Sequence, residues 1–142
     1  MESISKNSSN SFQCIDALEV SLSIERQGFI FYDKAAKSAT DPRVRDVFLY
    51  LANEENEHIQ SLQNKTRFLQ PALANKATSR KSRTESFIKN KILGKVFPIP
   101  GDDKKRTHIA HSDFEALSIG IDAEMRSIEV LGQLIASEEK MD

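Results

Sequence analysis

The chain has 142 residues, of which 39% are hydrophobic and 29% charged, and its formal net charge is −1 at pH 7. A chain of this length forms one domain around one core, and it holds no apolar run of about 18 residues that could span a membrane. The near-neutral charge argues against a general nucleic-acid-binding protein, and the single cysteine excludes an internal disulfide and a Cys-x-x-Cys metal site.

Residues 1–11 are polar and rich in Ser and Asn, which predicts a disordered tail ahead of a single domain over residues 12–142. This tail lacks the apolar centre of a secretory signal and the Arg-rich pattern of a transit peptide. We therefore expect a cytoplasmic protein.

A first helix is predicted over residues 12–38, because apolar residues recur there at steps of three and four. This apolar row consists of Leu18, Leu22, Phe29 and Tyr32. Glu25 falls within the row, so we expect its carboxylate to point inward. Tyr32 lies two turns further on, and we interpret it as a core aromatic rather than a hydrogen-bond donor.

A second helix is predicted over residues 42–68, because Asp41 and Pro42 form a helix-start signal after a tight turn. Its apolar row consists of Val44, Phe48, Leu51 and Leu62. Glu55 and His58 take two consecutive places in that row, and residues three apart on a helix share a face. This is a metal-chelating spacing on a side that should be buried. The alternative is an exposed acidic face, because Glu54 and Glu57 belong to the same run.

Residues 70–111 form a connector much longer than the usual loop between two helices. Residues 76–106 hold ten basic and three acidic side chains, which indicates a solvated surface or, alternatively, a docking site for an acidic partner. Ser82 and Glu85 read as a capping box for a short helix that ends at Gly94. The connector can return along the second helix, roughly 40 Å at 1.5 Å per residue, so that the third helix runs parallel to the second.

A third helix is predicted from about Asp113, after the capping box of Ser112 and Glu115. Its apolar row consists of Leu117, Ile121, Ile128, Leu131 and Ile135, with Glu124 inside it. Glu124 follows Ala116 as Glu25 follows Ala17, by eight residues, which suggests a duplicated helical hairpin. The repeat predicts a fourth helix with its own Glu-x-x-His, and we expect this helix to be absent or supplied by another chain.

Four candidate metal ligands thus lie on three helices: Glu25, Glu55, His58 and Glu124. Carboxylates can bridge two cations, and imidazole favours iron or manganese over calcium. His108 and His111, at the end of the connector, are interpreted as surface residues or, alternatively, as substitutes for missing nitrogen ligands.

Three segments resemble the rubrerythrin branch of the ferritin-like superfamily: residues 17–32, residues 48–58 and residues 116–124. The resemblance implies an all-α, ferritin-like antiparallel helix bundle with a long crossover between helices two and three. It implies a non-haem di-iron centre, with manganese as an alternative, that reacts with peroxide or oxygen. Glu25 and Glu124 would be terminal ligands, and Glu55 with His58 one half-site.

A second copy of the chain could supply the missing helix, because three helices leave a long apolar groove, so we expect a homo-oligomer. With a single cysteine in the chain, we also expect an external electron donor such as a rubredoxin-like protein. The chain departs from the family pattern, because it carries four of the six expected ligands. It also has Ile121 and Ser127 where a further glutamate is usual in peroxidase-type members. The alternative function is therefore a non-catalytic helical module that binds a metal or a partner and has lost turnover.

Overall fold

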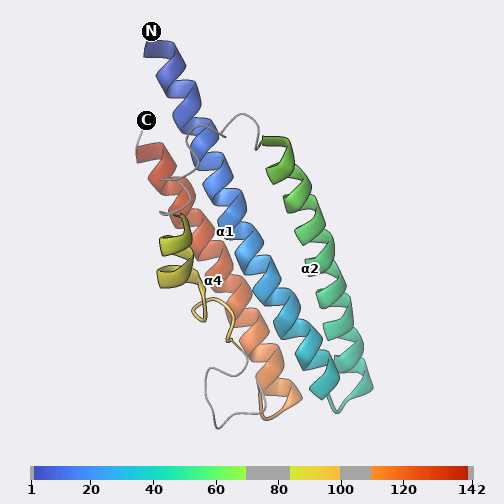
Figure 1. Ribbon diagram of the computed structural model, residues 1–142. Helices are drawn as coiled ribbons and strands as arrows, with labels where there is room; N and C mark the ends of the chain where they lie inside the picture. Colours follow the sequence, from blue (N-terminus) through green and yellow to red (C-terminus); the bar gives the residue numbers. More distant parts are fainter. Residues whose placement is uncertain (1, 70–83, 100–109, 141–142) are drawn as a thin grey trace.

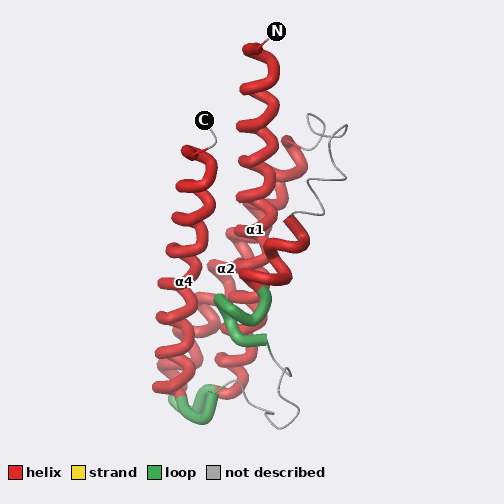
Figure 2. Tube along the Cα trace, turned by 90° about the vertical axis from the view of Figure 1, so that its left-hand side faces the viewer, coloured by secondary structure: helices red, strands yellow, loops and turns green. Residues whose placement is uncertain are grey.

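The computed structural model describes residues 2–69, 84–99 and 110–140. Figure 1 shows three long helices, α1 (Glu2–Ser38), α2 (Pro42–Leu69) and α4 (Asp113–Lys140), and the short π-helix η2 (Ile88–Ile92), which packs beside α1. The described residues contain no β-strand, as the tube in Figure 2 shows. Within these ranges no helix has both the length and the apolar character needed to cross a membrane. The all-α prediction is therefore confirmed.

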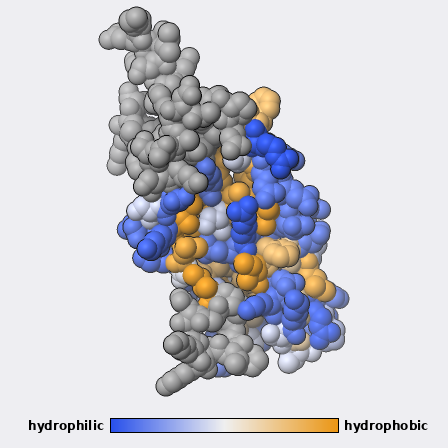
Figure 3. Space-filling model, in the orientation of Figure 1, coloured by the Kyte–Doolittle hydropathy of each residue, from blue (hydrophilic) through white to orange (hydrophobic). Residues whose placement is uncertain are grey.

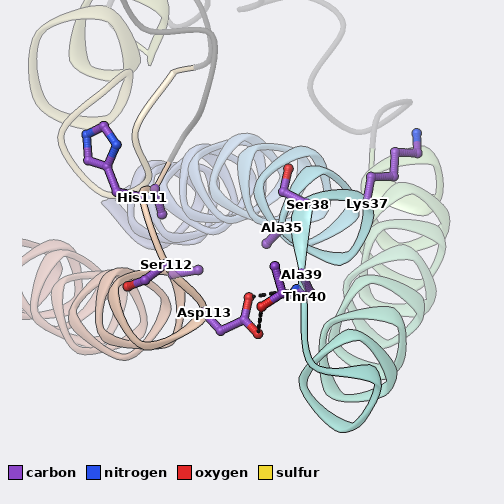
Figure 4. A pocket seen from close by; sticks show the side chains of 10 residues that line it. Ala35, Lys37, Ser38, Ala39, Thr40, His111, Ser112 and Asp113 are labelled. Atoms are coloured by element: carbon purple, nitrogen blue, oxygen red, sulfur yellow. Dashed lines mark hydrogen bonds between the residues drawn. The ribbon is translucent and has the colours of Figure 1, made fainter.

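The α1–α2 turn and the start of α4 lie at the same end of the bundle. The Arg43 N–H donates to Asp41 Oδ1 at 2.8 Å, which confirms Asp41 as the N-cap of α2. The carboxylate of Asp113 accepts from the Thr40 N–H at 3.1 Å (Figure 4) and from the Asp41 N–H at 2.8 Å. Because α2 and α4 start side by side and rise together in Figure 1, they run parallel, and the crossover topology is confirmed.

The capping box predicted ahead of α4 forms with one change. Ser112 Oγ accepts from the Glu115 N–H at 3.0 Å, as expected for an N-cap serine. The Glu115 carboxylate accepts from the His111 N–H at 3.0 Å, one residue earlier than the usual return bond. The helix start at Asp113 is therefore held by two side chains.

Helix α1 begins at Glu2, whereas the composition of residues 1–11 predicts a disordered tail. Residues 2–27 contain neither Pro nor Gly, so nothing in the covalent structure interrupts a helix that extends upstream from the packed part of α1.

The centre of the core is an aromatic cluster that joins α1, α2 and the connector. Tyr32 and Phe31 meet at a centroid distance of 5.4 Å, and Phe97 lies 5.7 Å from each of them. Phe48 of α2 stacks on Tyr32 at 6.1 Å. Phe31, Phe48 and Phe97 are all at most 1% exposed. The connector therefore contributes a central core residue, a role that its loop-like composition does not predict.

The short helix predicted in the connector is present, and part of it is a π-helix. Residues 84–87 are α-helical and continue into η2, and the Leu93 N–H donates to the Ile88 carbonyl at 2.9 Å. Gly94 has φ of 73°, a left-handed conformation that suits glycine after a helix end. Ser82 of the predicted capping box lies outside the described residues.

The prediction of which α4 residues are buried is wrong in part. Ala116, Gly120 and Ala123 are buried, whereas Ile121 is 61% and Ile128 73% exposed. Helix α4 packs chiefly on α1, and small residues allow this close approach. The periodicity of the sequence identifies the apolar side of α4. It does not tell which residues of that side contact α1.

Candidate metal centre

Three of the four sequence-predicted ligands come together between α1 and α2. Glu25, Glu55 and His58 each place one ligand atom within 4.8 Å of the other two. Glu55 and His58 lie one turn apart on α2, and Glu25 faces them from α1, where His58 Nδ1 lies 3.3 Å from Glu25 Oε2. The Glu-x-x-His spacing therefore brings its two side chains to one point, as the sequence predicts.

The burial of these ligands differs. Glu55 is buried at 8% exposure, whereas the side chain of Glu25 is 25% and that of His58 55% exposed. The prediction that His58 points to the buried side of α2 is thus wrong. Its ring borders an open cavity of about 240 Å³ that Glu25 and residues of α2 and α4 also line. The centre is therefore closed on the Glu55 side and accessible on the His58 side.

Burial raises the pKa of Glu25 above its ordinary value. The nearby imidazole of His58 opposes this shift through its charge and hydrogen bond, and the charge of Glu124 adds to it. Two carboxylates and an imidazole in a half-buried site need a positive charge for the ionised state to be favourable. A divalent cation meets this requirement, so the donor set fits a metal ion.

Glu124 lies near this group but outside it. The Tyr32 hydroxyl donates to Glu124 Oε1 at 2.8 Å, and the Glu124 residue as a whole is exposed. Burial and this hydrogen bond both raise the pKa of Tyr32, so its hydroxyl stays protonated and remains a donor. The interpretation of Tyr32 as a core aromatic is correct, since it is 2% exposed, but it is wrong in denying a hydrogen bond. The sequence signal was present, because Tyr32 lies two turns from Glu25 on the same face.

Gly28 and Phe97 form a wall of the centre that the sequence reasoning missed. A Cβ atom at Gly28 would lie 3.2 Å from Glu55 Cδ and 3.2 Å from two ring atoms of Phe97. The absence of a side chain at this position lets the Glu55 carboxyl group and the Phe97 ring approach α1. A glycine inside a helix costs about 1 kcal/mol relative to alanine, and that cost is the signal that could have pointed to it.

Of the two connector histidines, only His111 lies in the part of the chain that the structure describes, and it is not part of this centre. His111 is exposed and borders a separate pocket between the end of α1 and the start of α4 (Figure 4). That pocket also includes Ser38, which is roughly 20 Å from Glu25 along α1 at 1.5 Å per residue. The idea that His111 replaces a missing ligand is therefore wrong within one chain, and His108 lies outside the described residues.

A helical bundle with a crossover connection, whose helices bring Glu and Glu-x-x-His side chains to one point, belongs to the ferritin-like class. The family model of rubrerythrin matches residues 16–111, which is more than half of the chain. The chain is therefore a member of the rubrerythrin family. No curated protein and no solved structure matches it.

Proposed function

We propose that this protein is a non-haem iron protein that reduces peroxide or oxygen at the centre formed by Glu25, Glu55 and His58. The observation that supports this best is the meeting of these three ligand atoms within 4.8 Å of one another, in a chain of the rubrerythrin family. Carboxylate and imidazole ligands suit iron and manganese, and manganese is the competing metal.

Glu124 is proposed as the fourth ligand and as the link to a second metal ion. Its charge acts on Glu25, and the Tyr32 hydroxyl holds one of its oxygens at 2.8 Å. The other carboxylate oxygen is not used by this hydrogen bond. Tyr32 is thus a positioning residue, which restricts Glu124 to orientations near Glu25.

The protein side chains have limited roles in the proposed reaction. Reduction of hydrogen peroxide to two water molecules breaks the O–O bond and consumes two electrons and two protons. Iron, when bound, supplies the one-electron chemistry that carboxylates and imidazole lack. The open side of the centre admits a small substrate, while Glu55 and the Phe97 wall exclude water from the other side.

The electrons have to come from a redox group outside these 142 residues. The chain has one cysteine and therefore no disulfide or iron–sulfur centre of its own. An external electron carrier, such as a small iron–sulfur protein, is therefore part of the proposal.

A second copy of the chain is proposed to cover the open face of α4. The described part of α4 leaves Ile121, Met125 and Ile128 between 61% and 73% exposed, in one stripe at steps of four and three. A stripe of this kind on a soluble helix usually contacts another protein surface. Glu124 lies beside the stripe, so such an interface would also border the open side of the centre.

The iron content of the purified chain, after expression in iron-rich medium, tests the metal centre. We expect at least one iron per wild-type chain and a loss of most of it in Glu55→Ala and His58→Ala. Glu57→Ala is the matched control, because Glu57 is an exposed acid on the same helix. Iron content that is low in the wild type and unchanged by these substitutions would contradict the proposal.

Turnover is tested separately on the iron-loaded, reduced protein. Addition of hydrogen peroxide should oxidise the iron, which is followed by absorbance, and the rate should rise with peroxide concentration. Stable reduced iron in the presence of peroxide would instead support the non-catalytic alternative, a metal-binding module that has lost turnover.

A further inference from the structure

The connector segment of residues 84–99 has a basic outer side and an apolar inner side. Lys89, Lys91 and Lys95 are exposed, whereas Ile92, Val96 and Phe97 are at most 1% exposed. In Figure 3 hydrophilic side chains gather where Figure 1 places η2. We call the three lysines the basic face.

The basic face is rigidly attached to the bundle. Arg126 of α4 donates to the Val96 carbonyl at 3.2 Å, and the Val96 N–H donates to the Ile92 carbonyl at 3.3 Å. The inner residues belong to the same core as α1 and α2. The lysines are therefore presented on an ordered backbone, which lowers the entropy cost of docking a partner there.

The same segment reaches the candidate metal centre through Phe97. This residue is two positions after Lys95, roughly 7 Å along an extended chain. Two of its ring atoms and Glu55 Cδ each lie 3.2 Å from a Cβ placed at Gly28. One short stretch therefore joins the protein surface to the buried side of the centre.

We propose that the basic face is the docking site for a small acidic protein that carries one electron at a time, with Phe97 lying between that partner and the metal centre. This proposal rests on the proposed function, which requires an electron donor. Charge complementarity selects an acidic partner, because the described residues 84–99 hold three lysines and one acidic residue, Glu85, in a chain of net charge −1.

The electron balance is simple. Each docked carrier is oxidised by one electron, so two docking events supply the two electrons that reduce one peroxide to two water molecules. No covalent bond forms between the two proteins.

The test is a binding measurement by titration calorimetry on the full chain, with an acidic plant-type [2Fe–2S] ferredoxin as the probe. The variant Lys89→Glu/Lys91→Glu/Lys95→Glu reverses the basic face. The control Lys34→Glu/Lys37→Glu/Arg67→Glu reverses three exposed cations on α1 and α2 and changes the net charge by the same amount. We expect the first variant to weaken binding by about tenfold or more, and the control to weaken it much less.

Raising the salt concentration should weaken binding to the wild type and have little effect on the reversed variant, because exposed charge pairs are screened. Equal weakening by both variants would show a net-charge effect and overturn the proposal. Tighter binding of a 20-base-pair DNA duplex than of the ferredoxin would overturn it in favour of nucleic acid.

A second variant, Phe97→Leu, tests the proposed position of the ring. It should slow iron reduction by the bound ferredoxin by several-fold when the rate is expressed per bound iron and per bound ferredoxin. An unchanged rate would overturn the role of Phe97. Iron content and ferredoxin binding are measured separately, so a failed metal centre is distinguishable from a failed docking site.

Discussion

At the scale of single residues, the candidate centre depends on positions that carry no metal-binding chemistry themselves. Gly28 makes room for Glu55, Phe97 closes one side, and Tyr32 orients Glu124. The positions of the candidate ligands therefore depend on these neighbouring residues as well as on the carboxylates and the imidazole themselves.

Gly28→Ala should disturb the centre although alanine is the better helix former. The added Cβ would meet Glu55 and Phe97 at 3.2 Å, so both must shift by a few tenths of an ångström. We expect the gain in helix propensity, about 1 kcal/mol, to be lost to overpacking that costs about 1–3 kcal/mol. Urea unfolding measures the stability, and iron titration should show weaker binding.

Gly132→Ala is the control for this substitution, because a Cβ at Gly132 meets nothing within 4 Å. It should stabilise α4 by up to about 1 kcal/mol and leave iron binding unchanged. If the two substitutions changed stability and iron binding equally, the close contact between Gly28 and Glu55 would not matter for the centre.

Tyr32→Phe should remove the hydrogen bond to Glu124 and keep the aromatic core. Loss of one such bond costs about 0.5–1.5 kcal/mol of stability, and loss of an orienting partner lowers metal affinity by about tenfold. Urea unfolding and iron titration measure the two effects. Tyr50→Phe is the control, since Tyr50 is 63% exposed. An unchanged iron affinity in Tyr32→Phe would argue that Glu124 is not a ligand.

At the scale of helices, Asp113 connects α4 to the α1–α2 turn. Its carboxylate accepts from two backbone N–H groups and from the Thr40 hydroxyl. The hydrogen bonds from Asp41 and Thr40 hold the pKa of Asp113 below its ordinary value of 3.8. This contact places the start of α4 beside that of α2, and so determines the direction of the third helix.

Asp113→Asn should therefore reduce stability in a pH-dependent way. A lowered carboxylate pKa stabilises the fold above the ordinary pKa, and the contribution is lost as the pH falls through the folded pKa. The wild type should be the more stable protein at pH 7, and the difference should shrink below about pH 4. Urea unfolding across pH measures it, with Asp122→Asn, an exposed acid on α4, as the control. A difference that does not change with pH would exclude this charge effect.

At the scale of the whole molecule, the described residues form an incompletely covered bundle. Helix α1 is covered by α2, α4 and the connector, whereas the apolar stripe of Ile121, Met125 and Ile128 on α4 faces solvent. His58 and Glu124 are exposed as well, and Glu124 lies beside the stripe on α4. A partner surface here would bury the stripe and alter access to the metal centre together.

Ile121→Ser/Ile128→Ser should weaken self-association of the chain by about tenfold or more, because it removes apolar surface from the proposed interface. Analytical ultracentrifugation over a range of concentrations measures this. The control Ile30→Ser/Leu49→Ser changes two partly exposed residues outside α4. A wild-type chain that stays monomeric at high concentration would contradict the proposal of a second copy.

The features predicted correctly from the amino-acid sequence are those that depend on neighbouring residues. The starts of α2 and α4 follow from capping residues, and the pairing of Glu55 with His58 follows from helical geometry. Their physical basis is local hydrogen bonding and the fixed number of residues per helical turn. Neither depends on how the helices pack against one another.

The features predicted wrongly depend on how whole helices pack. Three such features appear only in the folded chain. His58 and Ile121 are exposed, and Tyr32 donates a hydrogen bond to Glu124, 92 positions away. Phe97 lies beside Glu55. A broad apolar sector on a helix allows several rotations about its axis. Contacts between segments far apart in the chain select one of them, and periodicity carries no information about that choice.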